Sequence, residues 1–159
     1  DQLATLHLNQ ALGCDDQPDD CTFTDERVSV SEVTAATLPA VLGTSMPSGT
    51  SAVVGHIYDC DKNSVANANG RVYANGAMVQ GVEVYYFQSG RNGPFPVRRS
   101  LQTATSPDGL FLMPNVVPGG TVELRAYGKI DGVETLLSSV RVQPEADSVV
   151  ITDMDPLAE

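Results

Sequence analysis

The sequence has no tryptophan, only two histidines, and nine lysine and arginine residues against twenty aspartate and glutamate residues. The formal net charge of −11 creates a field that repels phosphate backbones and anionic membrane surfaces, so we expect no nucleic-acid partner. Long hydrophobic runs are also absent, because none approaches the roughly 18 apolar residues that cross a bilayer. We therefore expect no transmembrane segment, and a lipid anchor before residue 1 is compatible with that expectation.

The scarcity of histidine also counts against catalysis, because a nucleophile needs a base within reach. His56 lies in the middle of an expected strand, between Gly55 and Ile57. Asp108 and Asp131 each precede a glycine, which is a turn-forming pattern rather than an acid–base pair. The sequence contains no glycine-rich phosphate loop, paired-histidine motif or nucleophile elbow. We expect that the protein is not an enzyme, and we assign no catalytic residue.

The length of 159 residues suffices for one domain with an appendage, and the hydrophobic fraction of 42% is typical of a globular protein. Residues 1–50 carry eight acidic side chains and one basic one, and residues 43–51 are rich in Gly, Ser, Thr and Pro. Such a stretch is typical of a flexible connector. We expect an irregular acidic arm and linker over residues 1–50, part of which docks, and a sandwich domain over residues 51–159.

From residue 52 onward, short β-branched and aromatic runs are each closed by turn-forming residues, which predicts an all-β antiparallel sandwich of seven to eight strands. The expected strands cover residues 52–58, 71–74, 82–87, 101–105, 110–113, 122–127, 135–142 and 148–152. In the strongest, residues 82–87, alternation places Val82, Val84 and Tyr86 on one face and the intervening residues on the other. The inter-sheet core is expected to contain Phe111, Val84, Val122 and Leu124.

Three runs resemble a known family. These are residues 53–59 (VVGHIYD), 81–87 (GVEVYYF) and 103–122 (TATSPDGLFLMPNVVPGGTV). They are similar to carboxypeptidase regulatory-like domains, which are small transthyretin-like (prealbumin-like) Greek-key β-sandwiches. The resemblance covers residues 52–153, and it implies a mostly non-catalytic accessory of a larger secreted or surface protein. Dioxygenases with a similar sandwich bind iron through two His and two Tyr, whereas this chain has only His7 and His56. Hydrolases of the transthyretin family use several His and Arg and a C-terminal Tyr-Arg-Gly-Ser, whereas the sequence ends at residues 155–159 with DPLAE.

A polar turn follows the first expected strand. Asp59, Asp61 and Asn63 offer oxygen ligands at alternate positions, as in the first half of a calcium loop. The pattern departs from a complete loop, because Ser64 replaces the glycine at the sixth position and Gly70 replaces the glutamate at the twelfth. Calcium is the cofactor that this turn could hold, and an ordinary polar turn is the alternative. We expect no other cofactor.

The segment over residues 90–99 collects three of the nine basic residues around an aromatic side chain. Arg91, Phe95, Arg98 and Arg99 form a candidate partner-binding loop, because aromatic and arginine side chains are favoured at binding surfaces. Prolines on both sides of Phe95 limit the entropy that is lost when the loop is ordered. The alternative is an ordinary strand connection in which Phe95 packs on the edge of the sandwich.

The three cysteines bear on location. Six residues lie between Cys14 and Cys21, a loop length that allows the Cα separation of a disulfide. Because short loops close at low entropic cost, we favour this pairing, which leaves Cys60 unpaired. A bridge from Cys60 to either of the other two is the open alternative. Every pairing implies an oxidising compartment, whereas three free thiols would suit a cytosolic protein.

These observations predict a non-catalytic accessory, binding or structural domain of a secreted or envelope-anchored protein. The setting would be secreted, periplasmic or cell-surface, and the partner a protein or a carbohydrate. A calcium-stabilised or carbohydrate-binding surface domain is the alternative, and a hydrolase is less favoured. Sugar recognition would have to use Tyr58, Tyr73, Tyr85 or Phe95 as aromatic platforms, because tryptophan is absent.

Overall fold

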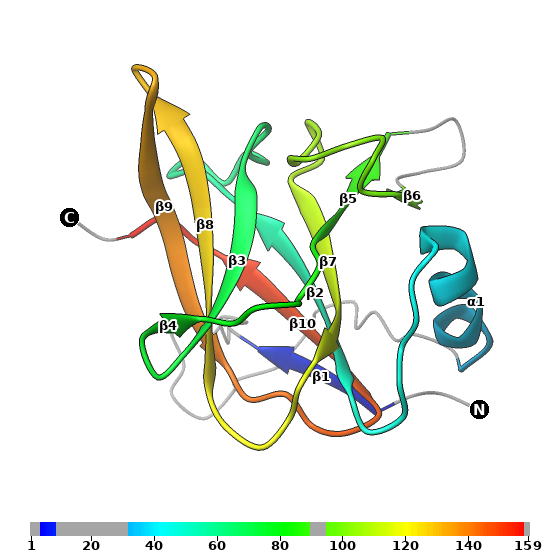
Figure 1. Ribbon diagram of the computed structural model, residues 1–159. Coiled ribbons are helices and arrows are strands. Elements are labelled where there is room, and N and C mark those ends of the chain that lie inside the picture. Colours follow the sequence, from blue (N-terminus) through cyan, green and yellow to red (C-terminus); the bar gives the residue numbers. More distant parts are fainter. Residues whose placement is uncertain (1–3, 9–31, 90–94, 158–159) are drawn as a thin grey trace, which may run out of the picture.

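The computed structural model describes residues 4–8, 32–89 and 95–157. The described residues are mostly β-strand, and the strands form two sheets that lie face to face (Figure 1). The expected all-β sandwich is therefore confirmed at the level of fold class. Among the described residues there are ten strands, rather than seven or eight.

One sheet has six strands and the other has four. In spatial order, the six-stranded sheet contains β1 (Ala4–Leu8), β10 (Ser148–Met154), β2 (Ser51–Ile57), β7 (Leu110–Val116), β5 (Tyr85–Gln88) and β6 (Phe95–Val97). The four-stranded sheet contains β4 (Ala77–Met78), β3 (Asn69–Ala74), β8 (Val122–Ile130) and β9 (Val133–Val142). Two-residue turns at Asn75-Gly76 and Asp131-Gly132 join β3 to β4 and β8 to β9, and all four residues have the positive φ that such turns require.

Two strand pairings are parallel: β1 with β10, and β10 with β2. The expectation of a purely antiparallel sandwich is wrong for these pairs. Tight turns enforce antiparallel pairing only between strands that they connect directly. The segments that connect β1, β2 and β10 are long, so local turn patterns say nothing about their relative direction.

Six of the eight expected strands occur close to their predicted positions, while two differ. Residues 101–105 form no strand, because their hydrogen bonds are local or come from loops: Leu101 donates to the carbonyl of Arg98, and Thr105 pairs with Ala68. The expected strand over residues 82–87 begins only at Tyr85. The faces predicted for it are nevertheless correct, since Val82, Val84 and Tyr86 pack on the inter-sheet core.

The core between the sheets is centred on Phe111, whose side chain is completely buried. Val122 and Leu124 are buried in the same cluster and Val84 packs against it, as predicted. The ring of Phe111 lies directly over Gly55 of β2, its neighbour in the β2–β7 pairing. A Cβ atom on Gly55 would be 2.1 Å from Phe111 Cζ, so only glycine leaves room for the ring.

The N-terminal region is not wholly irregular, which corrects the expectation for residues 1–50. It contributes β1 and an α-helix, α1 (Glu32–Leu42), which lies beside the six-stranded sheet on the side away from the other sheet (Figure 1). Leu42 is buried against Tyr85, Leu112 and Val149 on that outer face. The apolar outer face requires such a cover, and the expected docking of part of the arm is confirmed. The domain boundary at residue 50 stays a prediction.

The helix ends at Leu42 and is followed by Gly43, whose φ of 72° and hydrogen bond to the Pro39 carbonyl form a C-terminal cap.

Within the described part of the chain, no helix is long and apolar enough to cross a membrane.

We expect Phe111→Ala to lower the free energy of unfolding by about 3–5 kcal/mol, because it leaves a cavity between the sheets. Urea denaturation measures the change. Leu101→Ala is the control, since Leu101 is 73% exposed and its truncation should change stability by less than about 0.5 kcal/mol. Equal midpoints for the two variants would contradict the central place of Phe111 in the core.

Candidate functional site

A cleft of about 720 Å³ opens between the two sheets at the β4 and β5 side of the sandwich. Its walls come from β3 (residues 69–72), from β4 and the connection to β5 (residues 78–84), and from Tyr86, Arg99 and Thr103. The volume lies within the range of roughly 300–1,000 Å³ that is typical of ligand sites. The lining combines apolar side chains with a few polar groups, as such sites commonly do.

The floor of the cleft contains the hydroxyl of Tyr86, a residue that is 3% exposed. This hydroxyl accepts a hydrogen bond from the backbone N–H of Gly70 at 3.1 Å, so a side chain of one sheet satisfies a strand-edge donor of the other. Burial raises the pKa of Tyr86, while the Gly70 N–H and the charge of Arg99 act in the opposite direction. Tyr86 therefore stays a neutral phenol near neutral pH.

The outer wall of the cleft is formed by residues 82–84, which continue β5 backward without belonging to a sheet. Extending the β5–β7 register places Glu83 opposite Pro114 and Val82 opposite Asn115. Pro114 has no N–H to donate, and Asn115 has a φ of 73°, so β7 offers no regular ladder there. This is why the strand predicted from residue 82 begins at Tyr85.

Glu83 points away from the cleft toward the helix side of the sheet. Its carboxylate accepts hydrogen bonds from the hydroxyl of Tyr85 at 2.5 Å and from that of Thr44 at 3.5 Å. Arg99, by contrast, is exposed at the cleft and forms no ion pair with any described residue. The charged side chain that faces the mouth of the cleft is therefore Arg99, since the Glu83 carboxylate is turned to the other face of the sheet.

The structure separates the three described residues of the predicted partner-binding loop. Arg91 lies outside the described residues. Phe95 is 51% exposed on β6, an edge strand. The Arg98 guanidinium lies beside Gly43 at the C-terminal end of α1, where helix carbonyl groups favour a positive charge. Arg99 lines the cleft, and the role of the four as one binding loop stays a prediction.

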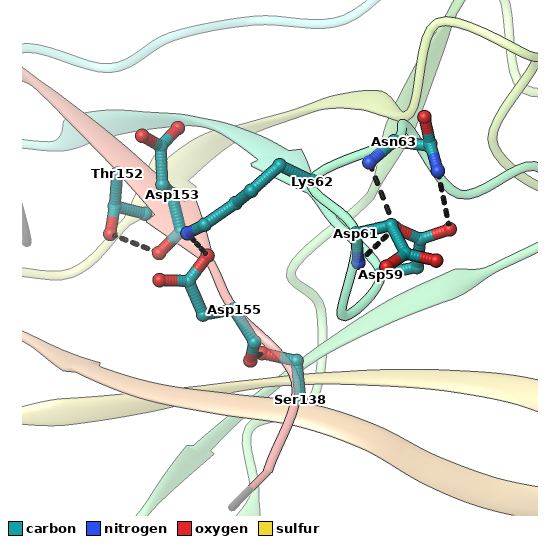
Figure 2. Close-up of polar contacts among 8 residues, drawn as sticks. All are labelled: Asp59, Asp61, Lys62, Asn63, Ser138, Thr152, Asp153 and Asp155. Atoms are coloured by element: carbon teal, nitrogen blue, oxygen red, sulfur yellow. Dashed lines mark hydrogen bonds and ion pairs between the residues drawn. The ribbon is translucent and has the colours of Figure 1, made fainter.

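The predicted calcium turn is organised by its own hydrogen bonds (Figure 2). Asp59 Oδ1 accepts from the backbone N–H groups of Asn63 at 2.8 Å and Asp61 at 2.9 Å, and Oδ2 accepts from the Asn63 amide at 3.2 Å. The contacts with Asn63, the larger effect, and with Asp61 lower the pKa of Asp59. Lys62 extends away to Asp155, at 2.6 Å.

In the described ranges, no three side chains of His, Cys, Asp or Glu are grouped so that they could hold a metal ion. Calcium at Asp59, Asp61 and Asn63 stays a prediction.

Cys60 is exposed beside this turn. Cys14 and Cys21 lie outside the described residues, so their disulfide also stays a prediction.

A serine–histidine contact is a feature that the sequence did not suggest. His56 Nε2 lies 2.7 Å from Ser64 Oγ, because the loop after β2 folds back and brings the two residues together. Burial lowers the pKa of His56, against the charges of Asp153 and Asp108. A Cβ on Gly109 would lie 3.0 Å from His56 and 3.1 Å from Ser64, so the backbone of Gly109 covers the pair. We interpret the contact as closing the loop.

The outer face of the four-stranded sheet carries a network of arginines and tyrosines. The Arg125 guanidinium lies 4.1 Å from the ring centroid of Tyr73, and that of Arg71 lies 4.4 Å from that of Tyr127. The two tyrosine hydroxyls are 3.2 Å apart. A guanidinium group thus occupies a ring face of Tyr73 that a sugar would need, and Tyr85, another predicted platform, is only 3% exposed.

Glu123 anchors this network, and its charge should stabilise the fold above its folded-state pKa. The Arg125 guanidinium at 2.8 Å and the Ser139 hydroxyl at 2.6 Å lower the pKa of Glu123 from 4.5 to about 2. This contribution is complete above pH 4.5 and is lost as the pH falls toward about 2. The difference in urea midpoint between the native protein and Glu123→Gln should shrink over that interval. Gln143→Ala, at an exposed residue that carries no titratable group, should show no such trend.

Tyr86→Phe should lower the free energy of unfolding by about 1–3 kcal/mol, because it leaves the buried Gly70 N–H without an acceptor. Thermal or urea unfolding measures the change. Tyr58→Phe is the matched control, since no described residue forms a hydrogen bond with the Tyr58 hydroxyl, and it should alter stability by less than about 0.5 kcal/mol. Equal losses for both variants would contradict the bridging role of the Tyr86 hydroxyl.

No family model matches the chain, and no curated protein matches it either. The likeness to carboxypeptidase regulatory-like domains therefore depends on the sequence runs alone.

Proposed function

We propose that the protein is a non-catalytic binding module that holds its ligand in the cleft between the two sheets. The observation that carries this proposal is the cleft itself, with a buried phenol at its floor and, at its mouth, an arginine that forms no ion pair with a described residue. In the proposal, the fold is a transthyretin-like Greek-key sandwich of the carboxypeptidase regulatory-like type. The domain serves as an accessory of a secreted or envelope-anchored protein.

The rigidity of the cleft supports a binding role. Its floor and outer wall are part of the packed core, because Tyr86 at the floor and Val84 and Val82 at the wall all contact the inter-sheet cluster. The backbone of β3 approaches so closely that a Cβ on Gly70 would lie 2.7 Å from Met113 Cε. A site whose walls are already ordered loses little conformational entropy when a ligand enters.

The chemistry of the lining also supports binding rather than turnover. The described lining contains no histidine, cysteine or serine, and its one carboxylate, that of Glu83, is engaged by Tyr85 and Thr44. The Ser64–His56 pair belongs to the loop after β2 and lies under Gly109. The setting outside the cytosol is supported by the family resemblance and by the proposed Cys14–Cys21 pairing.

Binding can be tested by titrating a small-molecule fragment library, which includes esters, into uniformly ¹⁵N-labelled protein. We expect a subset of the fragments to shift the amide signals of Gly70, Val84 and Arg99. Gln80→Trp should abolish these shifts, because it fills the cleft from an exposed turn position. Gln88→Trp, at an exposed position that does not line the cleft, should preserve them.

Two results would contradict the proposal. Shifts that map outside the cleft, or shifts that survive Gln80→Trp, would show that the cleft is not the binding site. Ester hydrolysis in the same samples, if Ser64→Ala abolished it, would show that the protein is an enzyme.

A further inference from the structure

Both walls of the cleft present strand edges. Along β3, the edge that faces the cleft is satisfied at Ala68 by Thr105 and at Val72 by Val79. Between them, the N–H of Gly70 bonds to the Tyr86 hydroxyl. Because the N–H and C=O of a strand residue point to the same side, the Gly70 carbonyl also faces the cleft. It has no hydrogen-bond partner among the described residues.

The opposite wall has a longer unpaired edge. In the β5–β6 pairing, Tyr86 is opposite Val97, and the same register places Val84 opposite Arg99. The strand β6 ends at Val97, and the chain turns where Leu101 donates to the carbonyl of Arg98. Because β6 does not continue past Val97, residues 82–84 have no strand beside them on that edge. In the described part of the chain, no backbone hydrogen bond satisfies these three residues.

The side chains around these edges would contact an extended peptide that bound between them. Val82 and Val84 alternate with Glu83, so the two valines face inward while the carboxylate is turned outward. Met78 and Val79 supply apolar surface on the β4 side. In strand-addition complexes, main-chain hydrogen bonds provide the affinity, and pockets for alternate side chains provide the specificity.

We infer that the ligand of the cleft is an extended peptide segment of a partner protein, held as an added strand along residues 82–84 and facing the Gly70 carbonyl of β3. The bound peptide places apolar side chains at alternate positions in the cleft, and one of its carboxylates contacts Arg99. This inference rests on the proposed function, since it names the ligand class of the same cleft. A compact solute could fill the volume but would leave the unpaired strand edges unsatisfied.

The test is a selection of displayed eight-residue peptides on the full chain, with counter-selection on the Gln80→Trp variant. We expect enrichment of peptides with alternating apolar residues and at least one acidic residue. Calorimetric titration of the synthetic peptides should show about tenfold weaker binding to Arg99→Gln, because a charge-assisted contact is lost. Arg141→Gln, at an exposed arginine on the other sheet, should bind normally.

Backbone methylation distinguishes an added strand from other modes of peptide binding. Successive N–H groups of a strand point to opposite sides, so N-methylation of the set that faces residues 82–84 should weaken binding at least tenfold, and methylation of the other set, which faces only the Gly70 carbonyl, should weaken it less. Equal effects of the two sets would overturn the inference.

The selection also separates a failure of the peptide inference from a failure of the proposed binding function of the cleft. If no peptide is enriched while fragments still bind at the cleft, the peptide inference fails and the proposed function stands. If neither peptides nor fragments bind there, both fail.

Discussion

The packing of Phe111 on Gly55 is the contact on which the rest of the sandwich depends. The ring occupies the space that any side chain at position 55 would need, since a Cβ there would lie 2.1 Å from Phe111 Cζ. Gly55 lies in β2, which is flanked by β7 and β10, and Phe111 lies in β7, which is flanked by β2 and β5. The contact therefore sits at the middle of the six-stranded sheet, where the four-stranded sheet closes over it.

A mismatch in width between the sheets explains where a ligand site can exist. Six strands face four, and the outer face of the wider sheet is covered in part by α1. At the β5 side the narrower sheet ends, and the cover consists of the connection from β4 and a single buried tyrosine. Tyr86 spans the gap by accepting the hydrogen bond of Gly70, which ties the two sheets together and leaves the cleft above it.

The candidate site could be predicted only in fragments. The three arginines and the phenylalanine over residues 90–99 indicated a binding surface, and Arg99 does line the cleft. Arg98 instead lies against the end of α1, a helix that the composition of the arm did not suggest. Tyr86 was predicted to share a face with Val82 and Val84, but its hydrogen bond to Gly70 depends on a strand of the other sheet. The Ser64–His56 contact likewise depends on how one loop folds back.

The sequence by itself determined the fold class, most strand positions and the inward faces of residues 82–87 and Phe111. These features follow from two-residue periodicity and from turn-forming residues, which act over a few neighbouring positions. The tertiary structure alone decided the parallel pairing of β10 with β1 and β2, the docking of α1, and the loss of strand structure at residues 82–84. Each of these depends on partners far away in the chain, such as the missing N–H of Pro114, and local patterns carry no information about which distant strands meet.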